Sequence, residues 1–296
     1  LVNLAQKAVR HKAGLSTRLD KDEAHAMMDI IRVGTSAGGA RAKAVIAVNA
    51  HNTVRSGQLD VPPGYSHWII KFDGDADETT GGAAGYGRIE YAYYKMALDC
   101  GIQMNESRLL EENGRAHFMT RRFDRAGHNK KLHMQTLCGL CHYDYNNPEA
   151  YAYEQAFQAM RLLRLPYSDA EQLFRRMVFN VFGCNNDDHT KNISFLMDEA
   201  GNWSLSPAYD MTYAYNPSSR WLARHQLSVN NKRQDITTSD ILAVASAMNI
   251  RKAKEITEQV SAVISRWNVY AKDAGVAGSQ IKAIGLLQTK NTVLRK

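Results

Sequence analysis

One short run of the sequence constrains the fold more than any other, because it places a dense group of polar side chains between apolar segments. The run FGCNNDDHTKNISFLMDEAGNWSLSPAYDMTYAY occupies residues 182–215. Its polar residues are Asn185, Asn186, Asp187, Asp188 and His189 in succession, then Asn192 and Asp210. Buried carboxylates are costly unless they are paired, hydrogen-bonded or bound to metal. The run is therefore either a strongly hydrogen-bonded turn or a site for something positively charged.

The composition is that of a globular protein with room for two lobes. Of the 296 residues, 44% are hydrophobic and 23% are charged. The net charge of +7 permits an acidic partner such as DNA, tRNA or an acidic protein surface, although a mildly basic enzyme surface is the simpler explanation. No apolar run is long enough for a membrane span and no secretory segment opens the chain, so we expect no membrane partner. The first residue is Leu1 rather than Met, so we expect an upstream part.

Cysteine usage favours a reducing cytoplasm, because four cysteines are too sparse for a disulfide framework. Cys138 and Cys141 form one CxxC pair. A structural zinc site would need a second pair of ligands of this kind, and the sequence has none. We therefore interpret the pair as packing residues of a helix and expect a cytoplasmic protein.

The residue pattern predicts a strand-rich first part. The expected elements are helices within 1–31, a loop and strand within 34–49, a strand at 67–72, a helix over 86–101 and a hairpin over 108–124. Asn113-Gly114 supplies the turn of that hairpin. A polar, glycine-containing linker at 125–131 marks the boundary, so we expect an N-terminal lobe over residues 1–128 and a C-terminal lobe over 129–296.

The second part has mainly helical spacing. The expected helices cover 154–165, 168–185, 239–249, 251–273 and 278–291, and short strands are expected at 193–197, 203–206 and 225–229. Ser168 and Glu171 have the spacing of a capping box at the start of the second helix. The polar run therefore follows a helix and contains a small hairpin.

Asp187, Asn192 and Asp210 have the spacing that phosphoryl transfer from ATP requires. The reaction needs a carboxylate that receives the proton of the acceptor hydroxyl, and oxygen ligands for Mg²⁺ that leave room for phosphate oxygens. Protein kinases use Asp-x4-Asn on a catalytic loop and a metal-binding Asp after a short hairpin. Asp187 and Asn192 have this spacing, and Asp210 follows the predicted hairpin. Asp-x4-Asn alone would indicate only a polar turn, whereas the three residues together favour a kinase site.

A kinase also needs a cation and a backbone loop for the phosphates, and the first part of the chain contains candidates for both. Lys71 lies in the predicted strand HWIIKF, where a lysine suggests an anionic ligand, although alternation alone would favour solvent. The earlier segment TSAGGAR, residues 35–41, has small residues that let backbone N–H groups approach phosphate oxygens. The loop, the lysine, Asp-x4-Asn and the late Asp occur in the order that an ATP phosphotransferase needs.

The sequence resembles the HipA-like serine/threonine kinases, which are the toxin components of bacterial toxin–antitoxin modules. The resemblance rests on GTSAGGARAKA, WIIKF, RRFDR, NNDDHTKNISFL and LSPAYDMT, and it runs from residue 3 to residue 275. It implies an α+β, protein-kinase-like fold with a mixed α/β N-terminal lobe and a mainly helical C-terminal lobe. It also implies that the upstream part is an additional N-terminal subdomain of this family.

The resemblance implies a role for each matching residue. Asp187 would be the catalytic base, Asn192 and Asp210 would bind Mg²⁺, and Lys71 would bind the phosphates of ATP. His189 follows the base by two positions, and we favour a role in tying the catalytic loop together over direct proton transfer.

The resemblance also implies how the nucleotide is held and how activity is regulated. The backbone of Arg121, Arg122 and Phe123 would hold the adenine, although many family members carry Glu at the position of Arg121. The loop expected to close over ATP consists of Ser36, Ala37, Gly38, Gly39 and Ala40. Ser36 stands where the family carries an autophosphorylated serine. A phosphate there adds about −1.5 to −2 charge, which would repel the triphosphate, eject the loop and switch off the kinase.

Several charged residues have more than one interpretation. Asp188 is either a further metal ligand or a group that anchors the loop, and Lys191 is placed to reach the transferred phosphate. Glu90, on the predicted helix over 86–101, is a candidate partner for Lys71. Two later helices are expected to carry a basic face, which comprises Arg161, Arg164, Arg175 and Arg176. A solvated surface is the default interpretation of this face, and a contact with nucleic acid is the alternative.

The resemblance implies a kinase toxin that phosphorylates a protein, with an aminoacyl-tRNA synthetase as the expected substrate and a small DNA-binding antitoxin as the expected partner. DNA would be contacted only through that antitoxin. Three alternatives remain: an antibiotic-type phosphotransferase that acts on a small molecule, an inactive kinase fold that serves as a scaffold in a repressor complex, and a metal-dependent hydrolase. The scaffold interpretation predicts loss of Lys71, Asp187, Asn192 or Asp210, and all four are present.

Overall fold

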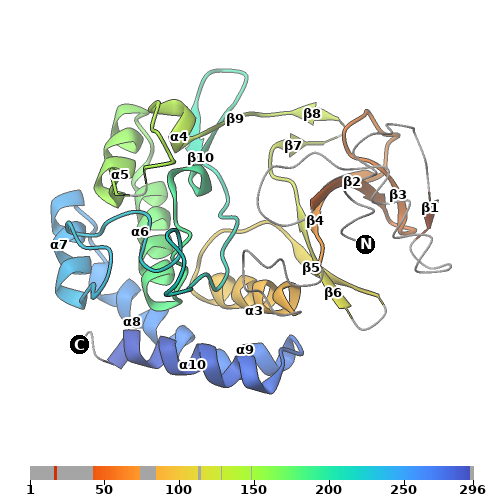
Figure 1. Ribbon diagram of the computed structural model, residues 1–296. Helices are drawn as coiled ribbons and strands as arrows, with labels where there is room; N and C mark the ends of the chain where they lie inside the picture. The colour runs from red at the N-terminus through yellow and green to blue at the C-terminus, as the bar shows by residue number, and fades with distance from the viewer. Residues whose placement is uncertain are drawn as a thin grey trace. The chain divides into compact units, whose positions relative to one another are not determined.

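The computed structural model of the protein describes residues 17–18, 43–73, 85–112, 115–127, 129–147 and 149–293 (Figure 1). The predicted loop at 35–41, nearly all of the predicted helical start and the turn at 113–114 lie outside the described residues. The chain divides by its internal contacts into two units. The first unit contains the described residues up to Tyr91 and Asn105–Leu132, and the second contains Ala92–Met104 and the residues from His133 onward.

The first unit is built on a six-stranded sheet in the order β1-β3-β2-β4-β6-β5. Its strands are β1 (Thr17–Arg18), β2 (Lys43–Asn49), β3 (Thr53–Ser56), β4 (Tyr65–Lys71), β5 (Ser107–Glu112) and β6 (Arg115–Arg121), and every neighbouring pair is antiparallel. The central pairing sets Ile46 opposite Trp68 and Ile70 opposite Met119. These four side chains belong to one buried cluster, so the register aligns the apolar face of β4 with both neighbours.

Helix α3 (Tyr86–Asp99) begins in the first unit, and its later residues group with the second. Its start is fixed by the carboxylate of Asp73, which accepts hydrogen bonds from the backbone N–H groups of Gly85 and Tyr86. At Gly87 a β-carbon would lie 1.9 Å from the carbonyl oxygen of Ala116 in β6. Only glycine therefore permits this approach of α3 to the sheet. The first unit also contains a short ladder of β7 (Arg125–Ala126) and β8 (Lys130–Lys131).

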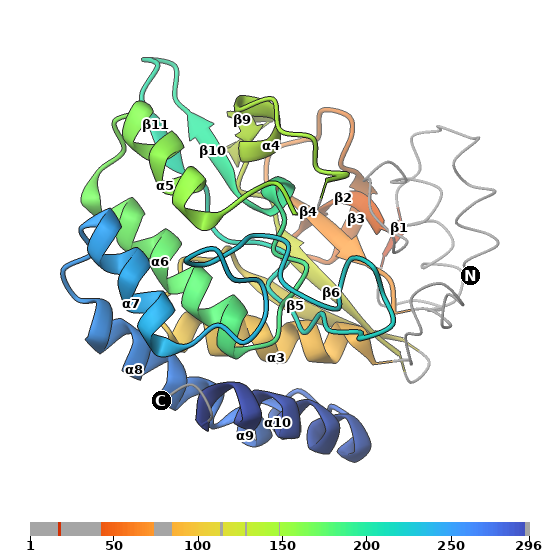
Figure 2. The same ribbon diagram turned by 60° about the vertical axis from the view of Figure 1, so that its left-hand side comes forward.

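The second unit is mainly helical and is organised around one buried helix (Figure 2). Its helices are α4 (Leu137–Leu140), α5 (Tyr153–Leu162), α6 (Tyr167–Phe182), α7 (Thr238–Met248), α8 (Ala253–Ile264), α9 (Trp267–Asp273) and α10 (Gly278–Val293). Helix α6 contacts α5, α8 and α10 and is buried along most of its second half. A three-stranded antiparallel sheet lies in the order β11-β10-β9, with strands β9 (His133–Thr136), β10 (Ser194–Met197) and β11 (Trp203–Leu205).

Three local predictions in the second unit are wrong. The predicted capping box does not form, because α6 begins after Pro166 without a side-chain cap and Ser168 lies inside the helix. The predicted helix over 251–273 is divided into α8 and α9 by a turn at residues 265–266, where the Ser265 hydroxyl donates to the carbonyl of Ser261. The predicted strand at 225–229 contains only isolated bridges, since its backbone has other partners, described below.

The predicted fold class is confirmed: the protein has a protein-kinase-like α+β fold, with a sheet-based first unit and a mainly helical second unit. The division at residues 128 and 129 stays a prediction about domains. Within the described part of the chain, no helix is both long enough and apolar enough to cross a membrane.

Candidate active site

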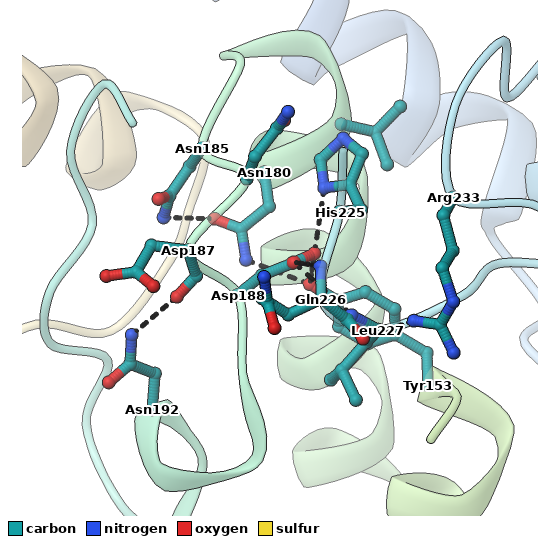
Figure 3. A network of polar contacts seen from close by, with 12 residues as sticks. Tyr153, Asn180, Asn185, Asp187, Asp188, Asn192, His225, Gln226, Leu227 and Arg233 are labelled. Atoms are coloured by element: carbon teal, nitrogen blue, oxygen red, sulfur yellow. Dashed lines mark hydrogen bonds and ion pairs between the residues drawn. The ribbon is translucent and has the colours of Figure 1, made fainter. Parts of the chain in front are cut away.

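The loop that carries Asp187 runs from the end of α6 to β10, and Figure 3 shows it with the side chains of Asp187 and Asn192. Backbone hydrogen bonds hold the loop at both ends. On the α6 side, the N–H of Asn186 donates to the carbonyl of Ala214 at 2.9 Å. On the β10 side, a short 3₁₀ turn covers Thr190–Asn192, and the N–H of Asn192 donates to the carbonyl of His189 at 2.9 Å. The loop therefore has a defined backbone course, as a catalytic loop must have.

Asp187 and Asn192 lie together on this loop. The amide nitrogen Nδ2 of Asn192 donates to the backbone carbonyl of Asp187 at 2.7 Å. The side chain of Asp187 is 47% exposed. The Nε2 atom of His189 lies 3.8 Å from Oδ1 of Asp187, which is beyond hydrogen-bonding distance and within the range of an ion pair. The predicted base and metal ligand are thus neighbours, and His189 flanks the base.

Asp188 has an environment opposite to that of Asp187. Its side chain is 1% exposed and accepts hydrogen bonds from the Tyr153 hydroxyl at 2.9 Å and from the backbone N–H of Gln226 at 2.7 Å. Nδ1 of His225 lies 2.9 Å from the same carboxylate, and the N–H of Leu227 donates at 3.4 Å. Of the two interpretations left open by the sequence, these contacts support the anchoring role. They also explain why 225–229 forms no regular strand.

Asp210 lies on a turn that is tied to the end of α6. Its φ angle is +52°, in the left-handed region that Asp and Asn tolerate better than most residues. Its carbonyl accepts from Nδ2 of Asn185 at 3.3 Å, and the same Nδ2 donates to Oδ1 of Asn180 at 2.9 Å. Nδ2 of Asn180 donates to the Tyr153 hydroxyl at 2.9 Å. A continuous hydrogen-bonded chain therefore runs from the Asp210 backbone to the Asp188 carboxylate.

The neighbouring Tyr209 fixes the same turn from the other side. Its hydroxyl donates to the carbonyl of Lys191 at 2.6 Å and lies 2.5 Å from the hydroxyl of Ser194. Burial raises the pKa of Tyr209, so its proton stays available for donation. Asn192 and Asp210 line one small cavity of about 20 Å³. The structure thus brings the two predicted Mg²⁺ ligands to the same place in the second unit.

Lys71 lies at the end of β4 in the first unit and forms an ion pair with Glu90 of α3. The side chains are 12% and 4% exposed, respectively. The capping of α3 by Asp73, two residues after Lys71, sets the helix and the strand end in place together. The candidate pairing of Lys71 with Glu90 is therefore present, as a largely buried pair in a supported position.

Several backbone groups of the segment predicted to hold adenine form hydrogen bonds with other residues of the first unit. The N–H of Arg121 donates to the carbonyl of Glu106 at 2.8 Å, and the N–H of Arg122 donates to the carbonyl of His67 at 2.9 Å. The carbonyl of Arg121 accepts from Asn105 Nδ2 at 3.2 Å. These bonds engage the N–H groups of Arg121 and Arg122 and the carbonyl of Arg121, so a contact with adenine would have to use other backbone groups of the segment.

The Arg122 guanidinium forms a two-pronged pair with Asp124 at 2.8 Å and 2.6 Å. Burial alone would raise the pKa of Asp124, but the hydrogen bonds and charges of Arg122 and Arg125 outweigh it and lower that pKa. The predicted loop residues Ser36, Ala37, Gly38, Gly39 and Ala40 lie outside the described residues.

The sequence analysis missed the residues that support the site and misplaced one arginine. Tyr153, Asn180 and His225 contact the Asp188 network, but no motif singled them out. The periodicity of α6 marked its inward face and was the signal that Asn180 would be buried. Arg176, expected on a solvated basic face, is 5% exposed and donates to the carbonyl of Ser206 at 2.6 Å. The expectation is wrong because position 176 falls on the buried side of α6.

Two further findings bear on metal binding. Among the residues that the structure describes, no three His, Cys, Asp or Glu side chains form a group able to hold a metal ion. Cys138 lies in α4 and Cys141 follows it, and both are free thiols. A site completed by phosphate oxygens needs fewer protein ligands than such a group provides.

The fold and this arrangement of loops place the protein in the kinase-like α+β class. The chain belongs to the HipA-like family: the model of the HipA-like C-terminal domain matches residues 35–267. The resemblance predicted from the sequence is therefore confirmed. No curated protein matches the chain.

Among the solved structures that are similar to the protein are the following two. One is from the HipA toxin–antitoxin system of Shewanella oneidensis MR-1, in a complex of HipA, HipB and operator DNA, with a TM-score of 0.65 and 14% identity over 88% of this chain. At this identity the likeness shows the fold alone. The protein spans 64% of that HipA-complex chain. The other is the proinflammatory kinase CtkA of Helicobacter pylori, with a TM-score of 0.49 and 11% identity over 77% of this chain and 87% of that chain.

Proposed function

We propose that the chain is the catalytic part of a HipA-type serine/threonine protein kinase that uses ATP and Mg²⁺. The observation that carries the proposal is the gathering of Asp187, Asn192 and Asp210 in one supported group of loops in the second unit. Membership of the HipA-like family and the paired Lys71 of the first unit agree with it.

The donor set fits Mg²⁺ held jointly with phosphate. Nδ2 of Asn192 donates to the carbonyl of Asp187, so Oδ1 of the same amide is the atom suited to face a cation. Asp210 adds a carboxylate at the same cavity. Mg²⁺ favours oxygen ligands and usually keeps several positions for water and substrate phosphate, so one amide and one carboxylate suffice. When bound, Mg²⁺ would neutralise charge on the transferred phosphoryl group.

Asp187 is the residue proposed to accept the proton of the acceptor hydroxyl. Its side chain is half exposed, so a hydroxyl from another protein has access to it. Its backbone carbonyl is held by Asn192, which ties the base to a metal ligand. His189 would support the loop beside the base. Positioning and electrostatic stabilisation provide most of the catalysis in this class of reaction.

The first unit would bind the nucleotide. Lys71 is proposed to bind the ATP phosphates, with Glu90 holding its ammonium group in place. Arg122 and Phe123 would contact adenine through the backbone, with Arg121 beside them. The loop of Ser36, Ala37, Gly38, Gly39 and Ala40 would cover the phosphates, and a phosphate on Ser36 would open it by repulsion.

The proposed biological role follows the family. We propose a cytoplasmic toxin whose substrate is a protein, with an aminoacyl-tRNA synthetase as the first candidate. A small DNA-binding antitoxin is the proposed partner, and contact with DNA would pass through it. Support comes from the similar HipA chain, which was solved with HipB and operator DNA.

Incubation with ATP labelled at the γ-phosphate and Mg²⁺ tests the proposal. We expect label on the protein itself and on a protein of a bacterial lysate, with both lost in Asp187→Asn. Asp235→Asn is a matched control, because Asp235 is exposed and has a positive φ that Asn also tolerates. Label only on a small molecule would favour an antibiotic-type phosphotransferase, and no label on any acceptor would favour the scaffold. Ser36→Ala separates self-labelling from transfer to other proteins.

A further inference from the structure

The small cavity beside Asp210 is lined by three residues that carry buried polar atoms without a hydrogen-bond partner. Its lining includes Arg176 from α6, Asn185 from the end of α6 and His189 from the catalytic loop. In the described part of the chain, Nε and Nη1 of Arg176, Oδ1 of Asn185 and Nδ1 of His189 are all buried and make no hydrogen bond. Buried polar groups are almost always satisfied by protein or by ordered water, so four such atoms on residues that line one cavity require an explanation.

The size and chemistry of the cavity indicate what fills it. Its volume of about 20 Å³ exceeds the ~10–15 Å³ that one water molecule needs. The unpaired atoms include the donors of Arg176 and the acceptor of Asn185, so an occupant must both accept and donate. An anion would face the Asp188 and Asp210 side chains that also line the cavity. A metal cation bound among these four atoms would face the Arg176 guanidinium, unlike the Mg²⁺ proposed above, which would lie against Oδ1 of Asn192 and the carboxylate of Asp210. Water satisfies both sets of partners.

We propose that this cavity binds one ordered water molecule, which accepts a hydrogen bond from Arg176, donates one to Oδ1 of Asn185 and bonds Nδ1 of His189. The remaining donor of Arg176, Nη2, is already bound to the carbonyl of Ser206, four residues before Asp210. Nδ2 of Asn185 is bound to the Asp210 carbonyl and to Asn180, which leaves Oδ1 as the atom for the water. The water joins α6, the catalytic loop and the Asp210 turn.

Arg176 is therefore a positioning residue for the Asp210 turn. This role rests on the proposed function, whereas the water site does not. Burial lowers the pKa of Arg176 to about 10, so it stays charged at neutral pH. Without the guanidinium, the water loses its donor and Ser206 loses its bond. The turn that carries a proposed metal ligand then loses its support from α6.

A crystal structure of the full chain at a resolution that shows waters tests the site directly. We expect one density peak within hydrogen-bonding distance of both the Arg176 guanidinium and Oδ1 of Asn185. The peak should disappear in Arg176→Met. It should persist in the control Arg175→Met, because Arg175 lies on the same helix but donates to the Cys100 carbonyl. An empty cavity in the unmutated protein, or an anomalous bromide signal there after a soak, would overturn the proposal without use of any variant.

The Mg²⁺ dependence of phosphorylation tests the positioning role. We expect Arg176→Met to raise the Mg²⁺ concentration for half-maximal activity several-fold, with a smaller change in the maximal rate, whereas Arg175→Met should leave both unchanged. A water seen in the crystal with unaltered Mg²⁺ dependence would refute the positioning role. An inactive unmutated protein would refute the proposed function, and the crystal structure would still decide whether the water is bound.

Discussion

Two adjacent aspartates divide the work of the candidate site. Asp187 has a side chain that is 47% exposed, whereas that of Asp188 is 1% exposed. The exposed carboxylate is the proposed proton acceptor, and the buried one accepts from the Tyr153 hydroxyl and from backbone N–H groups. A charge that is buried and fully hydrogen-bonded is suited to holding structure, because its removal leaves several donors without a partner.

The comparison shows how Asp187, the proposed base, can be held in position although its side chain is half exposed. The buried Asp188 side chain fixes the backbone at the residue that follows Asp187. The Asn192 side chain fixes the Asp187 backbone itself, by donating to its carbonyl. The Asp188 carboxylate connects through Tyr153 and Asn180 to α5 and α6, which are the buried supports of the second unit. The position of the Asp187 backbone therefore follows largely from the contacts of neighbouring residues. In the proposed mechanism, stability and chemistry are carried by neighbouring residues.

Substitution of Asp187 should give the largest effect on activity and almost none on stability. In Asp187→Asn we expect the rate of phosphoryl transfer to fall by about 10²–10⁴-fold, because the proton acceptor is lost. The free energy of unfolding should change by less than about 0.5 kcal/mol, as at other exposed positions. Initial rates with labelled ATP and urea unfolding followed by tryptophan fluorescence measure the two quantities. An equal loss in Asp235→Asn would contradict the assignment.

Substitution of Asp188 should reverse this pattern. Asp188→Asn keeps the size but replaces an acceptor oxygen with an amide that faces donor groups, so we expect a loss of about 2–4 kcal/mol in the free energy of unfolding. Activity should fall mainly through the smaller folded fraction and should recover on cooling. The comparison fails if Asp188→Asn is as stable as the unmutated protein.

The sequence predicted which polar residues would lie close together better than it predicted the residues that hold them in place. Asp187, Asn192 and Asp210 are recognisable because kinase chemistry fixes their spacing, and Asn192 with Asp210 indeed lines one cavity. Their support comes from residues such as Asn180 and His225, whose partners lie far along the chain. Spacing along one chain does not show which distant donors meet a buried carboxylate.

The errors in the fold have the same cause. The segment at 225–229 has the alternation of a strand, yet the N–H groups of Gln226 and Leu227 are bound by Asp188 instead of by a neighbouring strand. Ser168 and Glu171 match a capping box, but the helix begins earlier, and the nearby Asp169 accepts from the N–H of Leu205. Local patterns predicted most elements correctly, and tertiary hydrogen bonds overrode them at these points.

Glu90 is a buried carboxylate in the first unit. Its substitution tests whether its loss lowers mainly activity, as expected for Asp187, or mainly stability, as expected for Asp188. In Glu90→Gln we expect kcat/KM for ATP to fall by about 10- to 150-fold, because one charge-assisted hydrogen bond contributes about 1.5–3 kcal/mol and Lys71 loses its ion pair. Glu111→Gln is the control, since Glu111 pairs with Arg88 at the surface with a side chain that is 64% exposed. An unchanged kcat/KM in Glu90→Gln would show that Lys71 is held by other contacts.

Asp240 provides a buried carboxylate with only a structural role, and therefore a reference for Asp188. It lies at the start of α7 and accepts from the N–H of Thr237 at 2.8 Å, from Asn230 at 2.9 Å and from Lys232 at 2.9 Å. Burial alone would raise the pKa of Asp240, but the hydrogen bonds of Thr237, Lys232 and Asn230 outweigh it and lower that pKa. We expect Asp240→Asn to cost about 1–2 kcal/mol of stability at neutral pH and to leave activity unchanged.

The pH dependence of this loss identifies its origin. Because the pKa of Asp240 is lower in the folded protein than the ~3.9 of an unfolded chain, its contribution is complete above about pH 4 and is lost as the pH falls below that value. The difference between the unmutated protein and Asp240→Asn in urea unfolding should therefore shrink between about pH 4 and pH 2. A difference that stays constant over this range would mean that lost packing, rather than the charge of Asp240, accounts for the effect.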